Sequence, residues 1–295
     1  MKFFFHFLLV MLFLTSCEKN EEFPEVTEPN PELKDIIYIE NNDIILLPDT
    51  IADPFHVTNT PEITKLRIKI SHDHQKIAYY DYIAKLIVIL NRSGDTLNTI
   101  TVPYAKSLDW SLDDQTLYYL YDNEIHFFGD SLDCPSIPQF PGGNVIEASI
   151  SANLDLAYIV EQFSFEQGYT QELKIIAHGS TDIITIENNQ NYEMTYVNFS
   201  SNESDLTVGY EWLNNKLAYA ECYSGLSVTP DFNTQFNFDF FCPIYRSDLK
   251  CMVLGVIDSW SYHKVMAWKL NQDNQLKLFY ESSNIYDGSS YLDWK

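Results

Sequence analysis

Polar turn residues and apolar runs alternate along most of this chain in a repeated pattern. A clear copy has an apolar residue, a serine, an aspartate two residues later, and then an apolar run rich in Ile, Val and Tyr. The copies begin at Ile70, Trp110, Ile150, Phe199 and, in degraded form, Tyr245. Serine and aspartate stabilise bends by bonding to nearby backbone, and the flanking residue types favour strands. The pattern therefore predicts repeated hairpins with tight polar turns.

The spacing of these hairpins predicts the fold class. The serines Ser71, Ser111 and Ser151 follow one another at intervals of 40 residues. Several short strands at regular spacing, with few helical patterns, are typical of an all-β protein. A period of roughly 40 to 50 residues with four strands in each unit is typical of a β-propeller.

The two ends of the chain predict how the ring closes. The C-terminal residues 291–295 match residues 107–111, the innermost strand of the second repeat. The strands that should follow appear at the other end, where residues 35–46 align without a gap on residues 116–127. We therefore expect the C-terminal strand to complete the blade begun at the N-terminus, which removes a free sheet edge. Five central repeats and this composite blade predict a six-bladed β-propeller over residues 35–295.

One turn of the repeat resembles that of a known family. Residues 71–79 read Ser-His-Asp-His-Gln-Lys-Ile-Ala-Tyr. This resembles the Ser-Pro-Asp-Gly-Lys turn and following Ile-Ala-Phe of TolB-like β-propellers, with the proline and the glycine replaced. The resemblance implies the fold and leaves the function open, since propellers carry many functions. Residues 111–116 also resemble the Asp-box of sialidases, but lack its glycine and tryptophan.

The N-terminus predicts export and lipidation. Phe3–Leu14 is an apolar run that follows Lys2 and is interrupted by His6. It is shorter than the roughly 20 residues that span a bilayer, so it predicts a secretory signal peptide. The residues Leu-Thr-Ser-Cys at 14–17 resemble the lipobox of bacterial lipoproteins. The resemblance implies that residues 1–16 are the signal peptide and that acylated Cys17 binds the lipid bilayer.

Residues 17–34 are acidic and rich in proline, with few large apolar side chains. This composition predicts a disordered tether between the anchor and the propeller. The acidic residues directly after Cys17 resemble the signal that exports some Gram-negative lipoproteins to the outer face of the cell. The resemblance implies an outer-membrane lipoprotein at the cell surface. A periplasm-facing anchor is the alternative.

The net charge of the chain excludes one class of partner. The chain has 42 acidic and 18 basic residues, for a net charge of −24. Nucleic acid is excluded as a partner, because binding phosphates requires a basic patch.

Four cysteines remain beside Cys17, and an exported protein permits disulfides among them. They predict buried thiols or one disulfide, with the pairing open; they are Cys134, Cys222, Cys242 and Cys251.

No catalytic or metal-binding motif stands out. The chain has no G-x-S-x-G elbow, no H-E-x-x-H helix, and no phosphate-binding glycine pattern. His72, Asp73 and His74 have ligand-type side chains, but they lie in the repeated turn and we interpret them as turn residues. We therefore predict a protein that is not an enzyme and has no cofactor and no metal. A hydrolase or lyase with acids in the central channel is the less favoured alternative.

Aromatic residues predict a binding surface on one face of the propeller. The loops between the second and third strands are short in the first two repeats and become longer or aromatic in the next three. Loops on a rigid scaffold often form binding sites, although these rings could instead cover sheet edges. The candidate ligand-binding residues are Phe163, Phe165, Tyr169, Tyr192, Trp212, Trp260, Tyr262 and His263. We predict that they bind a glycan, a peptide or a protein, the alternative being a structural partner in an envelope complex.

Overall fold

The computed structural model describes most of the chain after the predicted tether. The described residues are 33–49, 52–138, 143–165, 168–187, 192–199, 205–212, 218–223, 232–236, 239–246, 251–259, 262–270, 276–281, 285–286 and 288–294. Some side chains within these ranges, among them those at 192, 211–223, 232–241 and 256–263, lie outside the description. Cys17 and the predicted signal peptide also lie outside it. Over the described ranges, no helix has the length and apolarity needed to cross a membrane.

The described elements are all strands. In chain order they are β1 (Ile36–Glu40), β2 (Asp43–Leu47), β3 (Phe55–His56), β4 (Lys65–Ile70), β5 (Lys76–Asp81), β6 (Leu86–Asn91), β7 (Thr96–Thr101), β8 (Ser107–Trp110), β9 (Leu117–Tyr121), β10 (Glu124–Phe128), β11 (Gly143–Ile150), β12 (Leu156–Ser164), β13 (Gly168–Ile176), β14 (Ile183–Glu187), β15 (Tyr192–Phe199), β16 (Leu206–Trp212), β17 (Ala218–Tyr223), β18 (Phe232–Phe236), β19 (Asp239–Arg246), β20 (Cys251–Ser259), β21 (Tyr262–Leu270), β22 (Leu276–Glu281), β23 (Ile285–Tyr286) and β24 (Gly288–Asp293).

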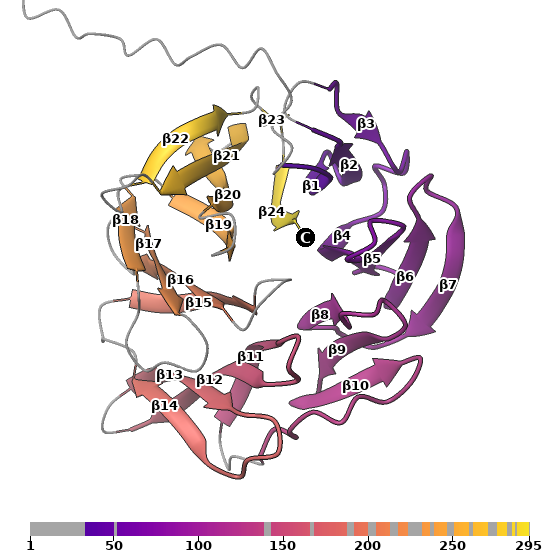
Figure 1. Cartoon of the computed structure of the whole chain (residues 1–295). Helices are drawn as coiled ribbons and strands as arrows, with labels where there is room; N and C mark the ends of the chain where they lie inside the picture. The colour runs from indigo at the N-terminus through magenta and orange to yellow at the C-terminus, as the bar shows by residue number, and fades with distance from the viewer. Residues whose placement is uncertain are drawn as a thin grey trace, which may run out of the picture.

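These strands form antiparallel sheets arranged in a ring. The described sheets have the strand orders β24-β1-β2-β3, β4-β5-β6-β7, β10-β9-β8, β11-β12-β13-β14, β15-β16-β17-β18 and β19-β20-β21-β22, with β23 beside β21. Figure 1 shows the sheets placed around a common centre, near which the C-terminus lies. The prediction of an all-β propeller fold is therefore confirmed.

The C-terminal strand pairs with the first strand, as the two ends of the sequence predicted. β24 lies antiparallel to β1, with Leu292 opposite Tyr38 and Asp293 opposite Ile37. Leu292 and Trp294 are each 1% exposed and belong to one apolar cluster with Tyr38. Residues from both ends of the chain thus build one sheet and its core.

The predicted polar turn is present between β4 and β5. The Ser71 hydroxyl donates to Asp73 at 2.6 Å, and the Lys76 N–H donates to the Ser71 Oγ at 2.9 Å. His74 has a φ of 58°, and Asp114 has a φ of 57° at the same position of the next repeat. Glycine adopts this left-handed conformation without strain, whereas His74 and Asp114 do not. The side-chain hydrogen bonds of the turn stabilise the bend in the absence of glycine.

Apolar layers lie between neighbouring sheets. Ile37 of β1 packs in one cluster with Ile70 of β4, and both are fully buried. Its neighbour Tyr38 points to the other side of the sheet, where it packs in a cluster with Val253 of β20. A strand buried on both faces reads as a continuous apolar run, which is the sequence pattern of β1.

Gly94 occupies a position that an alanine would not fit. Its φ is 91°, and a Cβ added there would lie 2.0 Å from the carbonyl oxygen of Val57. Gly179 has a φ of 71° but faces open space. We expect Gly179→Ala to lower the free energy of unfolding by about 1–2 kcal/mol, for the left-handed backbone, and Gly94→Ala to lower it further. Urea denaturation of both variants measures this, and equal losses would contradict the steric effect at Gly94.

Candidate binding sites

Three of the predicted aromatic residues form a cluster at the tip of the β12–β13 hairpin. Phe163 and Tyr169 lie opposite each other across the two strands. The Phe163 ring lies 4.9 Å from the Tyr169 ring and 5.6 Å from the Phe165 ring, between centroids. Their exposed fractions are 53% for Phe163, 100% for Phe165 and 74% for Tyr169. The Phe163 ring therefore lies against the other two rings, and all three face solvent and do not cover a sheet edge.

Four more of the predicted residues lie at the corresponding end of the next two sheets. Tyr192 of β15 lies opposite Trp212 of β16, where β16 ends. Tyr262 begins β21 beside His263, opposite Tyr286 of β23. The side chains of these predicted residues are outside the description, as is Trp260 altogether. The backbone register places the four at the end of the propeller that carries the aromatic tip, and whether their rings join it stays a prediction.

A cluster of charged side chains fills the centre of the ring, where the innermost strands meet. The Lys69 ammonium lies 3.2 Å from Asp293 and 3.8 Å from Asp109. The Arg67 guanidinium lies 2.6 Å from Glu147. The three carboxylate side chains are each less than a tenth exposed. Among the described residues, two cations and three carboxylates therefore share the centre of the ring, which is called the channel below.

Ion pairing and burial act in opposite directions in this channel. Burial opposes the charge of Lys69, but Asp293, and after it Tyr196 and Asp109, raise its pKa well above the ordinary value. Burial raises the pKa of Glu147 although Arg67 acts to lower it. The Lys69 ammonium therefore stays charged at neutral pH. The charged form of Glu147 is less favoured than that of a glutamate exposed to water.

The channel cluster was missed by sequence reasoning, although the chain contains a signal for it. Lys65, Arg67 and Lys69 alternate along β4, and Asp109 and Asp293 occupy the same position in two copies of Leu-Asp-Trp. Both patterns place charge at positions of an innermost strand. These residues could not be singled out from the sequence, because the chain has 42 acidic residues and most of them lie outside these two patterns.

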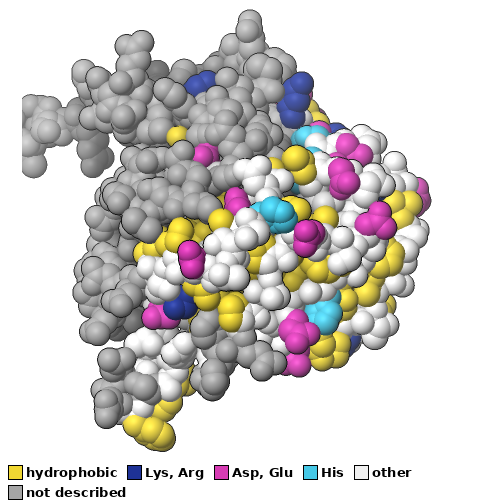
Figure 2. Space-filling view, turned by 60° about the horizontal axis from the view of Figure 1, so that its bottom comes forward, with side chains coloured by type: hydrophobic (Ala, Val, Ile, Leu, Met, Phe, Trp, Pro, Cys, Tyr) yellow, Lys and Arg dark blue, Asp and Glu magenta, His cyan; other side chains and the backbone are white. Residues whose placement is uncertain are grey.

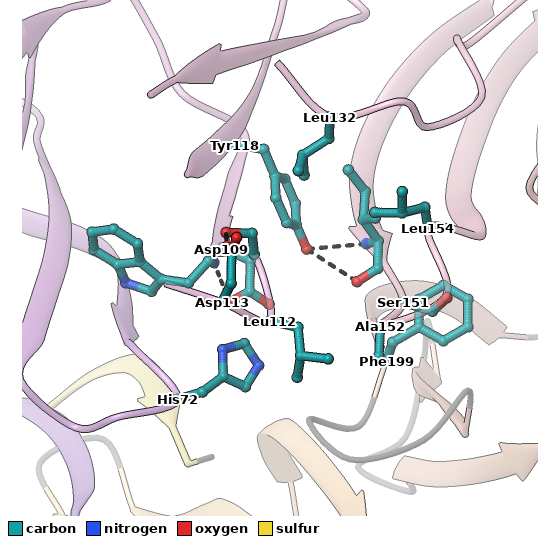
Figure 3. Close-up of a pocket in the computed structure, with 13 residues that line it drawn as sticks. His72, Asp109, Leu112, Asp113, Tyr118, Leu132, Ser151, Ala152, Leu154 and Phe199 are labelled. Carbon is teal, nitrogen blue, oxygen red and sulfur yellow. Dashed lines mark hydrogen bonds between the residues drawn. The ribbon is translucent and has the colours of Figure 1, made fainter. Parts of the chain in front are cut away.

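A cavity of about 390 Å³ opens beside the channel, at the polar turns of the repeats. Figure 3 shows the Tyr118 hydroxyl and the Asp109 carboxylate on one side of it, with His72, Leu112 and Phe199 around the rest. Tyr118 accepts from the Ile150 N–H at 3.0 Å, which fixes its ring in the wall. Ligand pockets have volumes of about 300–1,000 Å³, so the cavity has the size of a small-molecule site.

The histidines of the repeated turn lie beside carboxylates. The His72 Nδ1 lies 3.0 Å from Asp114, which also accepts the His72 backbone N–H at 2.7 Å. The His74 Nδ1 lies 3.2 Å from Asp35. Within the described ranges, no group of three or more His, Cys, Asp or Glu side chains could hold a metal ion. These contacts agree with the interpretation of the histidines as turn residues.

The described cysteines are partly or fully buried. Cys242 and Cys251 are buried, Cys134 is half-buried, and no disulfide joins any two of these three. Burial raises the pKa of Cys242 to about 11, which keeps its thiol protonated and unreactive at neutral pH. The side chain of Cys222 lies outside the description.

Comparison with known proteins supports the fold. No protein-family model and no curated protein sequence matches the chain. Among solved structures, the nidogen/laminin complex aligns with a TM-score of 0.56 at 12% identity, over 83% of this chain and 93% of that one. A structure from a study of two prolyl endopeptidases aligns with a TM-score of 0.53 at 10% identity, over 87% of this chain and 50% of that one. Kuenenia stuttgartiensis hydrazine synthase aligns with a TM-score of 0.51 at 10% identity, over 72% of this chain and 65% of that one.

These likenesses define a class of fold and nothing finer. At 10–12% identity they show a β-propeller-like fold alone, and propellers carry many functions. The chain spans 65% of the hydrazine synthase chain and half of the prolyl endopeptidase chain. Two of these similar structures are therefore enzymes that are longer than this chain.

Proposed function

We propose that this chain is a non-enzymatic bacterial lipoprotein whose six-bladed, TolB-like propeller binds a glycan, peptide or protein through the aromatic tip. Acylated Cys17 anchors it to the outer membrane, and the acidic tether holds the propeller away from the bilayer at the cell surface. The lipobox-like residues 14–17 support the anchor, and the six sheets among the described strands support the blade number.

The observation that carries the proposed function is the exposure of three neighbouring rings at one hairpin tip, two of which pack against the third. Phe165 is fully exposed, and Phe163 and Tyr169 are more than half exposed. Removing such rings from water is favourable, by about 25 cal/mol for each Å² of apolar surface buried. Aromatic side chains have few rotatable bonds and so lose little conformational entropy when they bind, which suits them to anchor a ligand.

The strong negative charge narrows the class of partner. Figure 2 shows Asp and Glu side chains scattered over the visible face, with few Lys or Arg. With a net charge of −24, the protein repels anionic surfaces and nucleic acid. A neutral glycan, or a peptide or protein segment that is apolar or basic, therefore suits the aromatic tip better than an acidic partner does.

The enzyme alternative receives less support from the channel. Its acids Asp293 and Glu147 lie in ion pairs with Lys69 and Arg67, which stabilise the centre of the ring. The alternative of a scaffold in a periplasmic or outer-membrane complex depends on which way the anchor faces. Protease treatment of intact cells distinguishes the two orientations, since a surface propeller is cleaved and a periplasmic one is protected.

We expect Phe165→Ala to weaken ligand binding by at least about tenfold, or about 1.4 kcal/mol, because ring-to-alanine changes in an anchor position exceed 1 kcal/mol. The measurement is a screen of the full chain in non-ionic detergent against a glycan array and a peptide library, followed by titration of each hit. The control is Leu97→Ala, which removes a half-exposed apolar side chain from β7. Hits that bind both variants and the parent equally would contradict a role for the tip.

A further inference from the structure

The cavity of about 390 Å³ lies at the opposite end of the propeller from the aromatic tip. Leu154, in the turn before β12, lines the cavity, whereas Phe163 near the end of β12 belongs to the tip. A nine-residue strand spans about 26 Å, so the two features do not form one site. The rings of the tip therefore take no part in binding a ligand in the cavity.

Three hydroxyl groups that line the cavity already bond within the protein. The Ser111 hydroxyl donates to Asp113 at 2.7 Å, and the Ser151 hydroxyl donates to Asp155 at 3.0 Å. The Tyr118 hydroxyl accepts a backbone N–H at 3.0 Å (Figure 3). A ligand gains little from these hydroxyls, because it would have to replace hydrogen bonds that exist without it.

The two carboxylates of the lining are compensated as well. Asp109 lies 3.8 Å from the Lys69 ammonium. Asp113 accepts from the Ser111 hydroxyl and from the Gln115 N–H, which lies at 3.1 Å. A cation would therefore lose its hydration without finding an unpaired carboxylate. An anion finds no partner either, since the described lining contains no lysine or arginine. The cavity thus favours a neutral ligand.

The rest of the lining offers apolar surface to a ligand. Leu112 is 54% exposed, and Leu132 and Leu154 are half-buried. All three line the cavity, together with the Phe199 ring (Figure 3). Removing such surface from water is favourable in proportion to the apolar area that is buried. An apolar ligand body therefore fits between the leucines.

The ring of His72 supplies one polar atom that is still able to bond. Its Nδ1 lies 3.0 Å from the Asp114 carboxylate. An ionised carboxylate only accepts, so Nδ1 carries the hydrogen and Nε2 of the neutral ring is an acceptor. The His72 ring lines the cavity, and its Nε2 makes no hydrogen bond to any described residue. This nitrogen can therefore accept a hydrogen bond from a ligand.

We propose that this cavity binds a neutral molecule that has an apolar body of about one ring and a hydroxyl group that donates to the His72 Nε2. The apolar body lies against Leu112, Leu132 and Leu154. The ligand class is an aryl or alkyl alcohol. This site and the aromatic tip take different ligands, and the failure of either proposal leaves the other standing.

The test is calorimetric titration of the full chain at pH 8 in non-ionic detergent, with the heat of titration into detergent alone subtracted. The four probes have similar shapes: 2-phenylethanol, its methyl ether, 2-phenylethylammonium and 3-phenylpropanoate. We expect the alcohol to bind at least about threefold more tightly than the ether, which cannot donate a hydrogen bond. We expect it to bind at least about tenfold more tightly than either ion, because the ions lose hydration without compensation.

Three results of this titration would overturn the proposal. They are equal affinity for the alcohol and its ether, binding of either ion as tight as that of the alcohol, and no heat with the alcohol at millimolar concentration.

A matched pair of variants locates the binding. Leu112→Trp places a larger side chain in the cavity, whereas Leu97→Trp makes the same change on β7; the two leucines are 54% and 53% exposed. We expect Leu112→Trp to abolish binding of 2-phenylethanol and Leu97→Trp to leave it unchanged. Binding that survives Leu112→Trp would place the alcohol elsewhere and overturn the proposal.

His72→Leu tests the hydrogen bond apart from the structure of the turn. Leucine already occupies this position of the turn in the next repeat, as Leu112. We expect His72→Leu to reduce the preference for the alcohol over its ether from at least about threefold to about one, without weakening the binding of the ether. A preference that survives the change, or an equal loss for both probes, would overturn the role assigned to His72.

Discussion

Deleting residues 291–295 is expected to abolish cooperative folding of the propeller. The deletion removes Leu292, Asp293 and Trp294, which are buried in the innermost strand of the closing sheet. It removes the pairing of Leu292 and Asp293 with β1, and it exposes the apolar layer that Leu292 and Trp294 share with Tyr38. The measurement is thermal unfolding followed by circular dichroism and calorimetry. The expected result is a broad, weak transition in place of a single one.

A point substitution separates packing from strand loss. Trp294 is 1% exposed, and Trp294→Ala is expected to lower the free energy of unfolding by about 3–5 kcal/mol because a large cavity remains. Phe165→Ala is the control, since Phe165 is fully exposed and its loss should change stability by less than about 0.5 kcal/mol. A truncated chain that melts like the parent would show that the ring does not depend on the last residues of β24.

Lys69→Met is expected to lower the free energy of unfolding by about 3–5 kcal/mol at pH 7. The substitution keeps most of the side-chain volume but removes the charge that faces Asp293 and Asp109. Removing one partner of a buried ion pair leaves uncompensated charge in a poor solvent, and this accounts for the size of the loss. Urea denaturation of parent and variant gives the difference directly.

The pH dependence of this loss has a defined sign. The pKa of Lys69 is raised above its ordinary value of 10.5, so its stabilisation is complete below pH 10.5 and is lost as pH rises through the raised value. The difference between parent and variant should thus be constant from about pH 6 to pH 10.

A surface ion pair provides the control for Lys69→Met. Lys264 lies 2.5 Å from Glu281, and both side chains are about a quarter exposed. Lys264→Met should cost no more than about 1 kcal/mol, as for other solvent-accessible pairs. If the two methionine variants lost the same stability, the channel charges would not be acting as a buried cluster.

The repeats and their turns could be predicted from the sequence because their contacts are local. Ser71 and Asp73 are two residues apart and bond within one turn, so the Ser-x-Asp pattern specifies the bend wherever it occurs. The pairing of the chain ends could be predicted too, because residues 291–295 repeat the motif of residues 107–111. The aromatic tip also depends on local contacts, because Phe163 and Tyr169 face each other across one hairpin.

The channel and the cavity depend on residues that are distant in sequence. Lys69 and Asp293 are 224 positions apart, and they meet because β24 returns to the centre of the ring. The register of β4 shifts between Leu66 and Lys69, and Arg67 has a φ of 55° there, which directs its side chain to Glu147. No local pattern specifies such a bulge.

The sequence by itself therefore determined the strands, the polar turns, the closure of the ring and the hairpin with the aromatic tip, since each depends on neighbours in the chain or on a repeated motif. Only the tertiary structure decided which few of the 42 acidic residues are buried together, which cations face them, and that a cavity opens beside them. The physical reason is that burial changes the energy of a charge by several kcal/mol, and burial is a property of the assembled ring.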